Sequence, residues 1–290
     1  MAGMTAPLPV FYDPRQHTDA NVSVSPSAGK PAQVMARWER SAVPIVRMPV
    51  TPASREQLAL AHDRGFVDGI LAGEHWNGFG NRSLEVAATL PWTSGSLVSA
   101  ARHVARHGGV AVSPTSGFHH ARHRSAGGFC TFNGLMVAVC VLQLEGLARR
   151  VGILDIDMHY GDGTDDILKR LGLTQAVHHW TFGRHHGDAS TAAAFMRDLP
   201  AVLAGFDDCE VVLYQAGADP FIDDPLGGVL TREQLRLRDR MVFEHFAGVG
   251  VALAWNLAGG YARDEAGTIE PVLRIHDATL EECHAAYSRG

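Results

Sequence analysis

A chain of 290 residues, 46% of them hydrophobic, can bury the core of one large α/β domain. Its net charge of -6 gives no basic stripe, so we expect no nucleic-acid partner. Four widely spaced cysteines without a CxxC pair indicate neither a disulfide framework nor a thiolate zinc cluster, and they favour reduced thiols in a cytoplasmic protein. We expect neither export nor a membrane span, because the sequence shows no leader pattern and no apolar run of about 18 residues.

The first hundred residues predict mostly helical structure after one short strand. The strand is expected at 9–12, a loop rich in Ser and Pro at 13–31, and helices at 31–40, 54–65, 84–90 and 96–108.

From residue 110 onward, short apolar strands alternate with helices. The expected strands are 110–112, 151–155, 175–180, 210–215 and 251–256, and the expected helices are 133–147, 165–171 and 231–246. Alternation of this kind is typical of βαβ units. We therefore expect an α/β fold of three layers, with a mainly parallel central sheet flanked by helices, in a single domain over residues 1–290.

Four polar segments each follow one of the predicted strands. They are 113–120, 155–162, 215–219 and 257–261. The carboxyl ends of parallel strands meet at one edge of a sheet, where ligands bind. We therefore expect these segments to form one site.

The segment after the strand at 151–155 has the chemistry of metal ligands. Side chains alternate in an extended segment, so Asp155, Asp157 and His159 are expected on one face. Carboxylates on one face repel each other unless a cation or a hydrogen-bond donor compensates. Asp219, in a tight turn of small residues, can join Asp157 and His159 as a third ligand. Three ligands leave one coordination position open, as in catalytic zinc sites, and oxygen-rich ligation also suits Fe(II), Co(II) or Mn(II).

His119 and His120 form a tandem pair in a loop rich in Gly, Pro and Ser. The spacing from His119 to His123 resembles the helical zinc motif HExxH, but its second position is His, and Pro114 argues against a helix. We interpret the pair as titratable groups that face a cleft; two exposed histidines are the alternative.

Gly259 and Gly260 follow the last predicted strand and precede Tyr261. Paired glycines let the backbone approach a ligand, so we expect both glycines at the substrate and the Tyr261 hydroxyl above it. Ordinary packing of Tyr261 is the alternative.

Together, the four segments resemble the histone deacetylase and acetylpolyamine amidohydrolase family of the arginase-deacetylase fold. The resemblance rests on SGFHHARHRSAGGFCTFN, ILDIDMHYGDGT, QAGADPFIDDPLGG and NLAGGY, which follow one another in the order of that family. It covers residues 113–261, whereas the first hundred residues match only loosely.

The resemblance implies a zinc-dependent amidohydrolase that removes acetyl or a related acyl group from a small amine, either lysine-like or polyamine-like. It makes Asp157, His159 and Asp219 the zinc ligands. It also implies a potassium ion beside the zinc. The implied potassium ligands are Asp155, Asp157, His159, Thr181 and Phe182, the last two through their backbone.

The resemblance also assigns the catalytic residues. Asp155 would orient His119, and Asp162 would orient His120. His120 would take the proton of the attacking water, and Tyr261 would bind the developing oxyanion.

Several features depart from the family pattern, among them Tyr160 where another His is common and Asn133-Gly134 where the family has paired Asn. Two others concern the substrate tube. Phe118 stands directly before the His pair, where the family usually has Gly or a shorter approach, and should reshape the floor of the tube that Phe129 lines. The segment 182–194 is short and lacks the aromatic loop that supplies the opposite wall, so we expect a wider acyl pocket. The histidines near this segment are expected to be solvated in a loop, with contact to substrate or metal as the alternative: His178, His179, His185 and His186.

Two other functions remain as alternatives. An arginase-type ureohydrolase needs two manganese ions and a DxHxD run, whose final position here is Gly161. A non-catalytic protein that binds an acylated ligand would need no oriented base beside a metal. We also expect that the helical first third or residues 274–290 could form a homo-oligomer interface.

Overall fold

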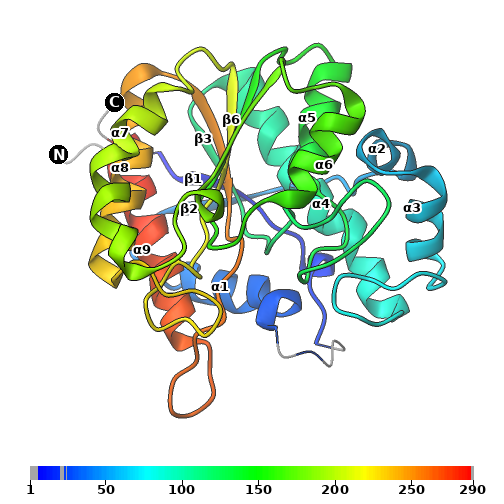
Figure 1. Cartoon of the computed structure of the whole chain (residues 1–290), viewed down its shortest axis with the longest axis horizontal. Coiled ribbons are helices and arrows are strands. Elements are labelled where there is room, and N and C mark those ends of the chain that lie inside the picture. Colours follow the sequence, from blue (N-terminus) through cyan, green and yellow to red (C-terminus); the bar gives the residue numbers. More distant parts are fainter. Residues whose placement is uncertain (1–5, 20–22, 24, 289–290) are drawn as a thin grey trace.

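Seven parallel strands form one sheet in the order β2-β1-β3-β7-β6-β4-β5 in the computed structural model, which describes residues 6–19, 23 and 25–288 (Figure 1). The strands are β1 (Leu8–Phe11), β2 (Ile45–Met48), β3 (Val110–Ser113), β4 (Val151–Asp155), β5 (Val177–Thr181), β6 (Val211–Gln215) and β7 (Ala252–Asn256). The central strands are apolar on both faces, as a parallel sheet covered by helices requires. The expected α/β class and mainly parallel sheet are confirmed.

Helices cover both faces of this sheet (Figure 1). One layer contains α2 (Arg55–Ala61), α3 (Arg64–Leu71), α4 (Leu84–His107), α5 (Gly134–Leu144) and α6 (Asp162–Leu171), and the other contains α1 (Lys30–Trp38), α7 (Ala192–Ala204), α8 (Arg232–Val249) and α9 (Glu270–Tyr287). Successive strand residues alternate between the two cores: Leu213 packs in one, and Tyr214 in the other. None of the helices in the described part of the chain combines the length and hydrophobicity that a membrane span requires.

The helix expected at 54–65 is wrong in its extent. The chain leaves α2 in an extended conformation at His62, and Asp63 caps α3 by accepting a hydrogen bond from the Phe66 backbone. A capping carboxylate thus begins a second helix where apolar spacing alone predicted one continuous element.

The two helices expected at 84–90 and 96–108 are one helix, α4. Pro91 lacks an N–H and normally interrupts a helix, but here its carbonyl accepts a hydrogen bond from the Ala53 backbone at 2.8 Å. Gly95 lets the segment before α2, residues 51–53, pack closely against α4. A Cβ at this position would lie 2.3 Å from the Thr51 carbonyl oxygen. Tertiary contact therefore supports the helix across its proline.

The strands end level with one another at the edge that carries the site. Thr181 and Gln215 both pair with Asp155, and Asn256 pairs with both Gln215 and Ser113. The four polar segments leave the sheet from these positions. The convergence expected at one edge is therefore confirmed.

Candidate metal centre and surrounding site

Asp157 and His159 lie in the turn after β4, and Asp219 lies in the turn after β6. One donor atom from each residue lies within 4.8 Å of the others. His159 Nδ1 is 3.2 Å from Asp157 Oδ1 and 3.2 Å from Asp219 Oδ2. Both carboxylates are buried and His159 is partly exposed. Two oxygens and one nitrogen that converge with one open side are a donor set that fits a divalent cation.

Without a metal, a proton on His159 compensates the negative charges of Asp157 and Asp219. Hydrogen bonds to Asp157 and Asp219 raise the pKa of His159 to about 11, so its imidazole is protonated between the carboxylates. Burial and the Asp157 charge raise the pKa of Asp219 to about 7. Although burial opposes it, the cationic His119 and His159 lower the pKa of Asp157 well below its ordinary value. A proton on His159 thus compensates two buried carboxylates where a metal would do so.

The turn that carries these ligands differs from the extended segment expected from alternation. β4 ends at Asp155, whose Oδ1 accepts a hydrogen bond from the Asp157 backbone at 3.2 Å. Asp157 Oδ1 in turn accepts from the His159 backbone at 3.0 Å, and Asp219 Oδ1 from the Met158 backbone at 3.1 Å. Asp155 thus ends the strand and holds the start of the turn that carries the ligands, and its other oxygen contacts His119 at 2.7 Å.

His119 and His120 are each held by one carboxylate. The Nδ1 of His119 lies 2.7 Å from Asp155 Oδ2, and the Nδ1 of His120 lies 2.7 Å from Asp162 Oδ1. The two ring centroids are 4.1 Å apart. His119 is buried and His120 is partly exposed. The structure thus shows an oriented pair with one accessible member, and a cleft in front of it stays a prediction.

The two histidines have opposite protonation preferences. Burial lowers the pKa of His119, but the charges of Asp155 and Asp157 outweigh it and raise that pKa to about 9. For His120, burial and the positive charge of His119 lower the pKa against the opposing effect of Asp162. His120 is therefore the neutral member that can accept a proton.

Tyr261 follows β7 and is positioned through its backbone. Asp224 Oδ2 accepts hydrogen bonds from the backbone N–H groups of Tyr261 at 2.6 Å and Ala262 at 2.9 Å. Burial, with the charges of Asp219 and Asp157, raises the pKa of Tyr261 far above its ordinary value. Its hydroxyl therefore stays protonated and is able to donate a hydrogen bond.

Both glycines before Tyr261 are in tight contact with their surroundings. The Gly259 backbone N–H donates to Asp157 Oδ2 at 2.8 Å, and Gly260 has a φ of +136°. A Cβ on Gly259 would lie 2.2 Å from Asp219 Oδ2. The structure thus places Gly259 against the metal-ligand carboxylates.

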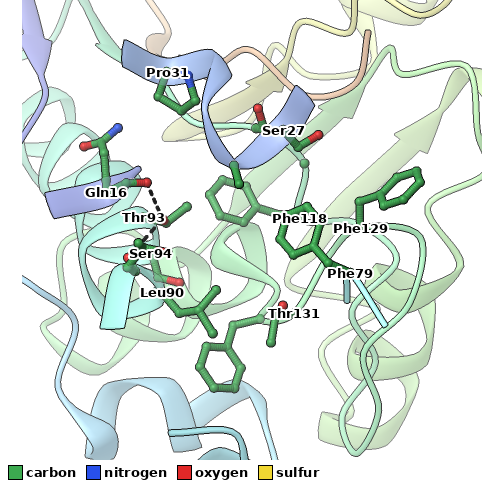
Figure 2. A pocket seen from close by; sticks show the side chains of 15 residues that line it. Gln16, Ser27, Pro31, Phe79, Leu90, Thr93, Ser94, Phe118, Phe129 and Thr131 are labelled. Atoms are coloured by element: carbon green, nitrogen blue, oxygen red, sulfur yellow. Dashed lines mark hydrogen bonds between the residues drawn. The ribbon is translucent and has the colours of Figure 1, made fainter. Parts of the chain in front are cut away.

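Phe129 and Phe118 line a narrow cavity of about 40 Å³ beside the site, together with Phe79 (Figure 2). Phe129 has a φ of +62°, and its backbone N–H donates to the Gly78 carbonyl at 3.0 Å. Its ring lies 5.6 Å from the Tyr261 ring and 6.2 Å from the Phe79 ring. Phe79, from the loop before α4, thus extends an aromatic wall that the sequence did not predict.

Of the residues expected at a potassium ion, Thr181 lies beside Asp155. Thr181 Oγ1 is 3.4 Å from Asp155 Oδ2 and accepts a hydrogen bond from the Gly161 backbone at 3.1 Å. Phe182 begins a short 3-10 turn directly after β5. Potassium ligation stays a prediction.

The expectation of solvated loop histidines near residue 182 is wrong for two of them. His178 and His179 belong to β5, and His179 Nδ1 lies 2.8 Å from Asp165 Oδ1 with only 4% of its side chain exposed. His185 and His186 follow the strand, and their rings contact Trp180. Contact with Phe206 accounts for His178, and pairing with Asp165 in α6 accounts for His179. His185 is exposed after the strand, as expected of a loop histidine.

Four supporting residues escaped sequence reasoning: Lys30, Arg122, Gln215 and Asp224. Gln215 donates to Asp155 Oδ1 at 2.9 Å, and Arg122 donates to the Asp162 oxygen that does not contact His120. Gln215 and Asp224 lie inside the quoted motif QAGADPFIDDPLGG, so proximity to Asp219 was an available signal. The only sequence signal for Lys30 was that lysine is rare in this chain, which contains two.

Comparison with known proteins agrees with this arrangement. Residues 27–182 match the model of the histone deacetylase domain, and this chain therefore belongs to the histone deacetylase family. The crystal structure of the HDA15 HD domain has the same fold, with a TM-score of 0.75 over 97% of this chain and 96% of that chain at 18% identity.

Two relatives show how far the sequence similarity extends. An uncharacterized protein of Picosynechococcus sp. is 30% identical over 200 residues, which cover 62% of this chain and 64% of that protein. Histone deacetylase 1 of Homo sapiens is 28% identical over 162 residues, or 47% of this chain and 33% of the human protein. The matched region thus spans about a third of the length of that deacetylase.

Proposed function

We propose that this protein is a zinc-dependent amidohydrolase that removes acetyl or a related acyl group from a small acylated amine, such as acetyl-lysine or an acetylpolyamine. One observation carries the proposal. Two histidines held by carboxylates, His119 and His120, lie beside the triad of Asp157, His159 and Asp219 at one edge of the sheet. Membership of the histone deacetylase family supports it.

Asp157, His159 and Asp219 would hold the zinc ion, which when bound polarises the amide carbonyl and makes water more acidic. Fe(II) or Co(II) would suit the same donors. A potassium ion held by Asp155, Asp157, His159, Thr181 and Phe182 would add positive charge beside it.

His120 would act as the general base. Its Nδ1–H is directed at Asp162 over 2.7 Å, which leaves Nε2 free to accept the proton of the attacking water. The same proton would then pass from His120 to the departing amine. The cationic His119 favours the neutral form of His120 before the reaction.

Tyr261 would stabilise the charge that develops on the carbonyl oxygen. Its hydroxyl remains a donor at neutral pH, and its backbone is fixed by Asp224. A donor that is positioned before the reaction stabilises negative charge without reorganisation. Phe129, together with Phe118, Gly259 and Gly260, would bound the passage for the acyl group.

The two rival functions explain less of the site. In the described ranges, the residues that could hold a metal form one group of three, whereas an arginase-type centre needs ligands for two ions. A protein that only binds acylated ligands has no need of two histidines with separated pKa values.

Turnover of a fluorogenic acetyl-lysine amide and of acetylpolyamines, with and without a chelator, tests the proposal. We expect zinc-loaded protein to hydrolyse at least one of them, the chelator to abolish hydrolysis, and added zinc to restore it. Asp219→Asn should be inactive, whereas Asp223→Asn, on the exposed part of the same loop, should match the wild type. Bound zinc without turnover of any acylated amine would favour the binding protein.

A further inference from the structure

Lys30 is a buried cation that contacts the turn beside the candidate metal centre. It is the first residue of α1, and its side chain is fully buried. Its Nζ donates to the Ala258 carbonyl at 2.6 Å and to the Gly259 carbonyl at 3.1 Å, across 228 and 229 residues of sequence. Both partners are neutral backbone groups. Burial therefore lowers the pKa of Lys30 to about 8, and the charges of Asp219, Asp157 and Asp224 oppose this by favouring the ammonium.

The two carbonyls belong to the turn that connects β7 to Tyr261. Ala258 has a φ of +52°, which is unfavourable for a residue with a Cβ and needs support from its surroundings. On its other side, this turn contacts the triad, where the Gly259 N–H donates to Asp157 Oδ2 at 2.8 Å. One peptide segment thus lies between the Lys30 ammonium and the ligand carboxylates.

A second buried cation provides a comparison. Arg238 in α8 donates to the Gly217 carbonyl at 2.6 Å, two residues before Asp219. Its guanidinium also pairs with the buried Asp239 at 2.9 Å. The charge of Arg238 is therefore neutralised locally. Lys30 forms no ion pair among the described residues, and its charge instead acts on Asp224 and on the ligand carboxylates Asp219 and Asp157.

We propose that Lys30 is a positioning residue that supports the Ala258–Gly259 turn and, through its charge, weakens the affinity of the Asp157, His159 and Asp219 triad for its metal. In the metal-free protein, the ammonium offsets the repulsion between buried carboxylates. When a divalent cation is bound, the same ammonium repels it. This inference rests on the proposed metal site and does not depend on which acylated amine is the substrate.

Substitutions at the two lysines test the proposal. Lys30→Met preserves length but removes the charge and the donors, Lys30→Arg preserves both, and Lys169→Met is the control because that side chain is 70% exposed. Zinc affinity is measured by competition with a chelator, and thermal unfolding is recorded with and without zinc. We expect Lys30→Met to bind zinc about three- to tenfold more tightly and to lose more stability without zinc than with it. Lys30→Arg and Lys169→Met should bind zinc like the wild type.

An unchanged or weaker zinc affinity in Lys30→Met would overturn the electrostatic part of the proposal. Lys30→Gln, which keeps a donor without a charge, gives the same comparison if the methionine variant does not fold. Steady-state kinetics distinguish support of the turn from a general effect on stability. Lys30→Met should lower kcat with little change in KM, whereas Lys30→Arg should have a kcat near that of the wild type. If the wild type hydrolyses no acylated amine, the proposed reaction fails, while affinity and unfolding still decide the role of Lys30.

Discussion

His119 and His120 are adjacent in the sequence, yet their surroundings push their pKa values in opposite directions. Asp155 and Asp157 favour a proton on His119, whereas His120 is less buried and lies beside a cation. Protonation is thus set by position relative to the turn after β4, a property that residue type does not reveal. A cation beside a neutral base is a useful pair for a reaction that develops negative charge.

The Tyr261 hydroxyl should act only during the chemical step. We expect Tyr261→Phe to lower kcat about 100- to 1,000-fold, as the loss of one oxyanion donor does, with a much smaller change in KM. Its backbone hydrogen bonds to Asp224 remain, so the melting temperature should stay near that of the wild type. Steady-state kinetics and thermal unfolding provide both measurements.

Tyr12→Phe is a suitable control, because among the described residues the Tyr12 hydroxyl has only a 3.4 Å contact, with His17. It should leave kcat unchanged. Wild-type kcat in Tyr261→Phe would show that the hydroxyl does not stabilise the reaction.

At the scale of secondary structure, the central strands were predictable and the periphery was not. β4, β6 and β7 each consist of four hydrophobic or glycine residues followed by one polar residue, between clear breaks, so their expected bounds lie close to those observed. β2 is an edge strand of mixed polarity, and Pro200 interrupts the pattern of α7, so both were missed. α9 was recognised only as a C-terminal segment.

The site was more predictable than the periphery because its residues follow strand ends. Asp157, His159 and Asp219 could be grouped from the rule that parallel strands end at one edge. The contact between Lys30 and the turn after β7 could not be predicted from the sequence, since it depends on how α1 packs against residues more than two hundred positions away. Phe79 was missed for the same reason, because contact between loops has no local signal.

Gly95 in α4 offers a test of packing against helix propensity. Alanine is a better helix former than glycine, but a Cβ here would lie 2.3 Å from the Thr51 carbonyl oxygen. We expect Gly95→Ala to destabilise the fold by about 1–3 kcal/mol, as overpacking does, measured by chemical denaturation.

The matched control is Gly248→Ala in α8, where a Cβ has no heavy atom within 4 Å. That substitution should stabilise the protein by up to about 1 kcal/mol. Equal effects at both glycines would contradict the close contact between α4 and the segment before α2.

For the whole molecule, metal binding and stability should be linked through pH. The raised pKa of His159, about 11, belongs to the metal-free fold, so this proton stabilises the metal-free fold fully below about pH 6.5 and is lost as pH rises through about 11. A metal must displace that proton. Zinc affinity should therefore rise at least about tenfold per pH unit between pH 6.5 and 8.5, and zinc should add at least about 1.4 kcal/mol of extra stabilisation per unit at fixed excess. The slope should be steeper near pH 6.5, because Asp219, with a pKa of about 7, then also loses a proton to the metal.

Thermal unfolding at several pH values, with buffered free zinc, measures this linkage. Asp219→Asn should show little zinc stabilisation at any pH, because one of the three ligands has lost its charge. A zinc-dependent shift of the melting temperature that stays constant between pH 6.5 and 8.5 would contradict a protonated His159 in the metal-free state.

The chain has only two lysines, and α1 removes one of them from solvent. Lys169 in α6 is thus the sole lysine ammonium at the surface, with 70% of its side chain exposed. An enzyme that acts on acyl-lysine would consequently present almost no target for acylation on itself. For the same reason, a succinimidyl ester should label the folded protein at Lys169 and otherwise only at the α-amine, which makes attachment of a fluorophore nearly site-specific.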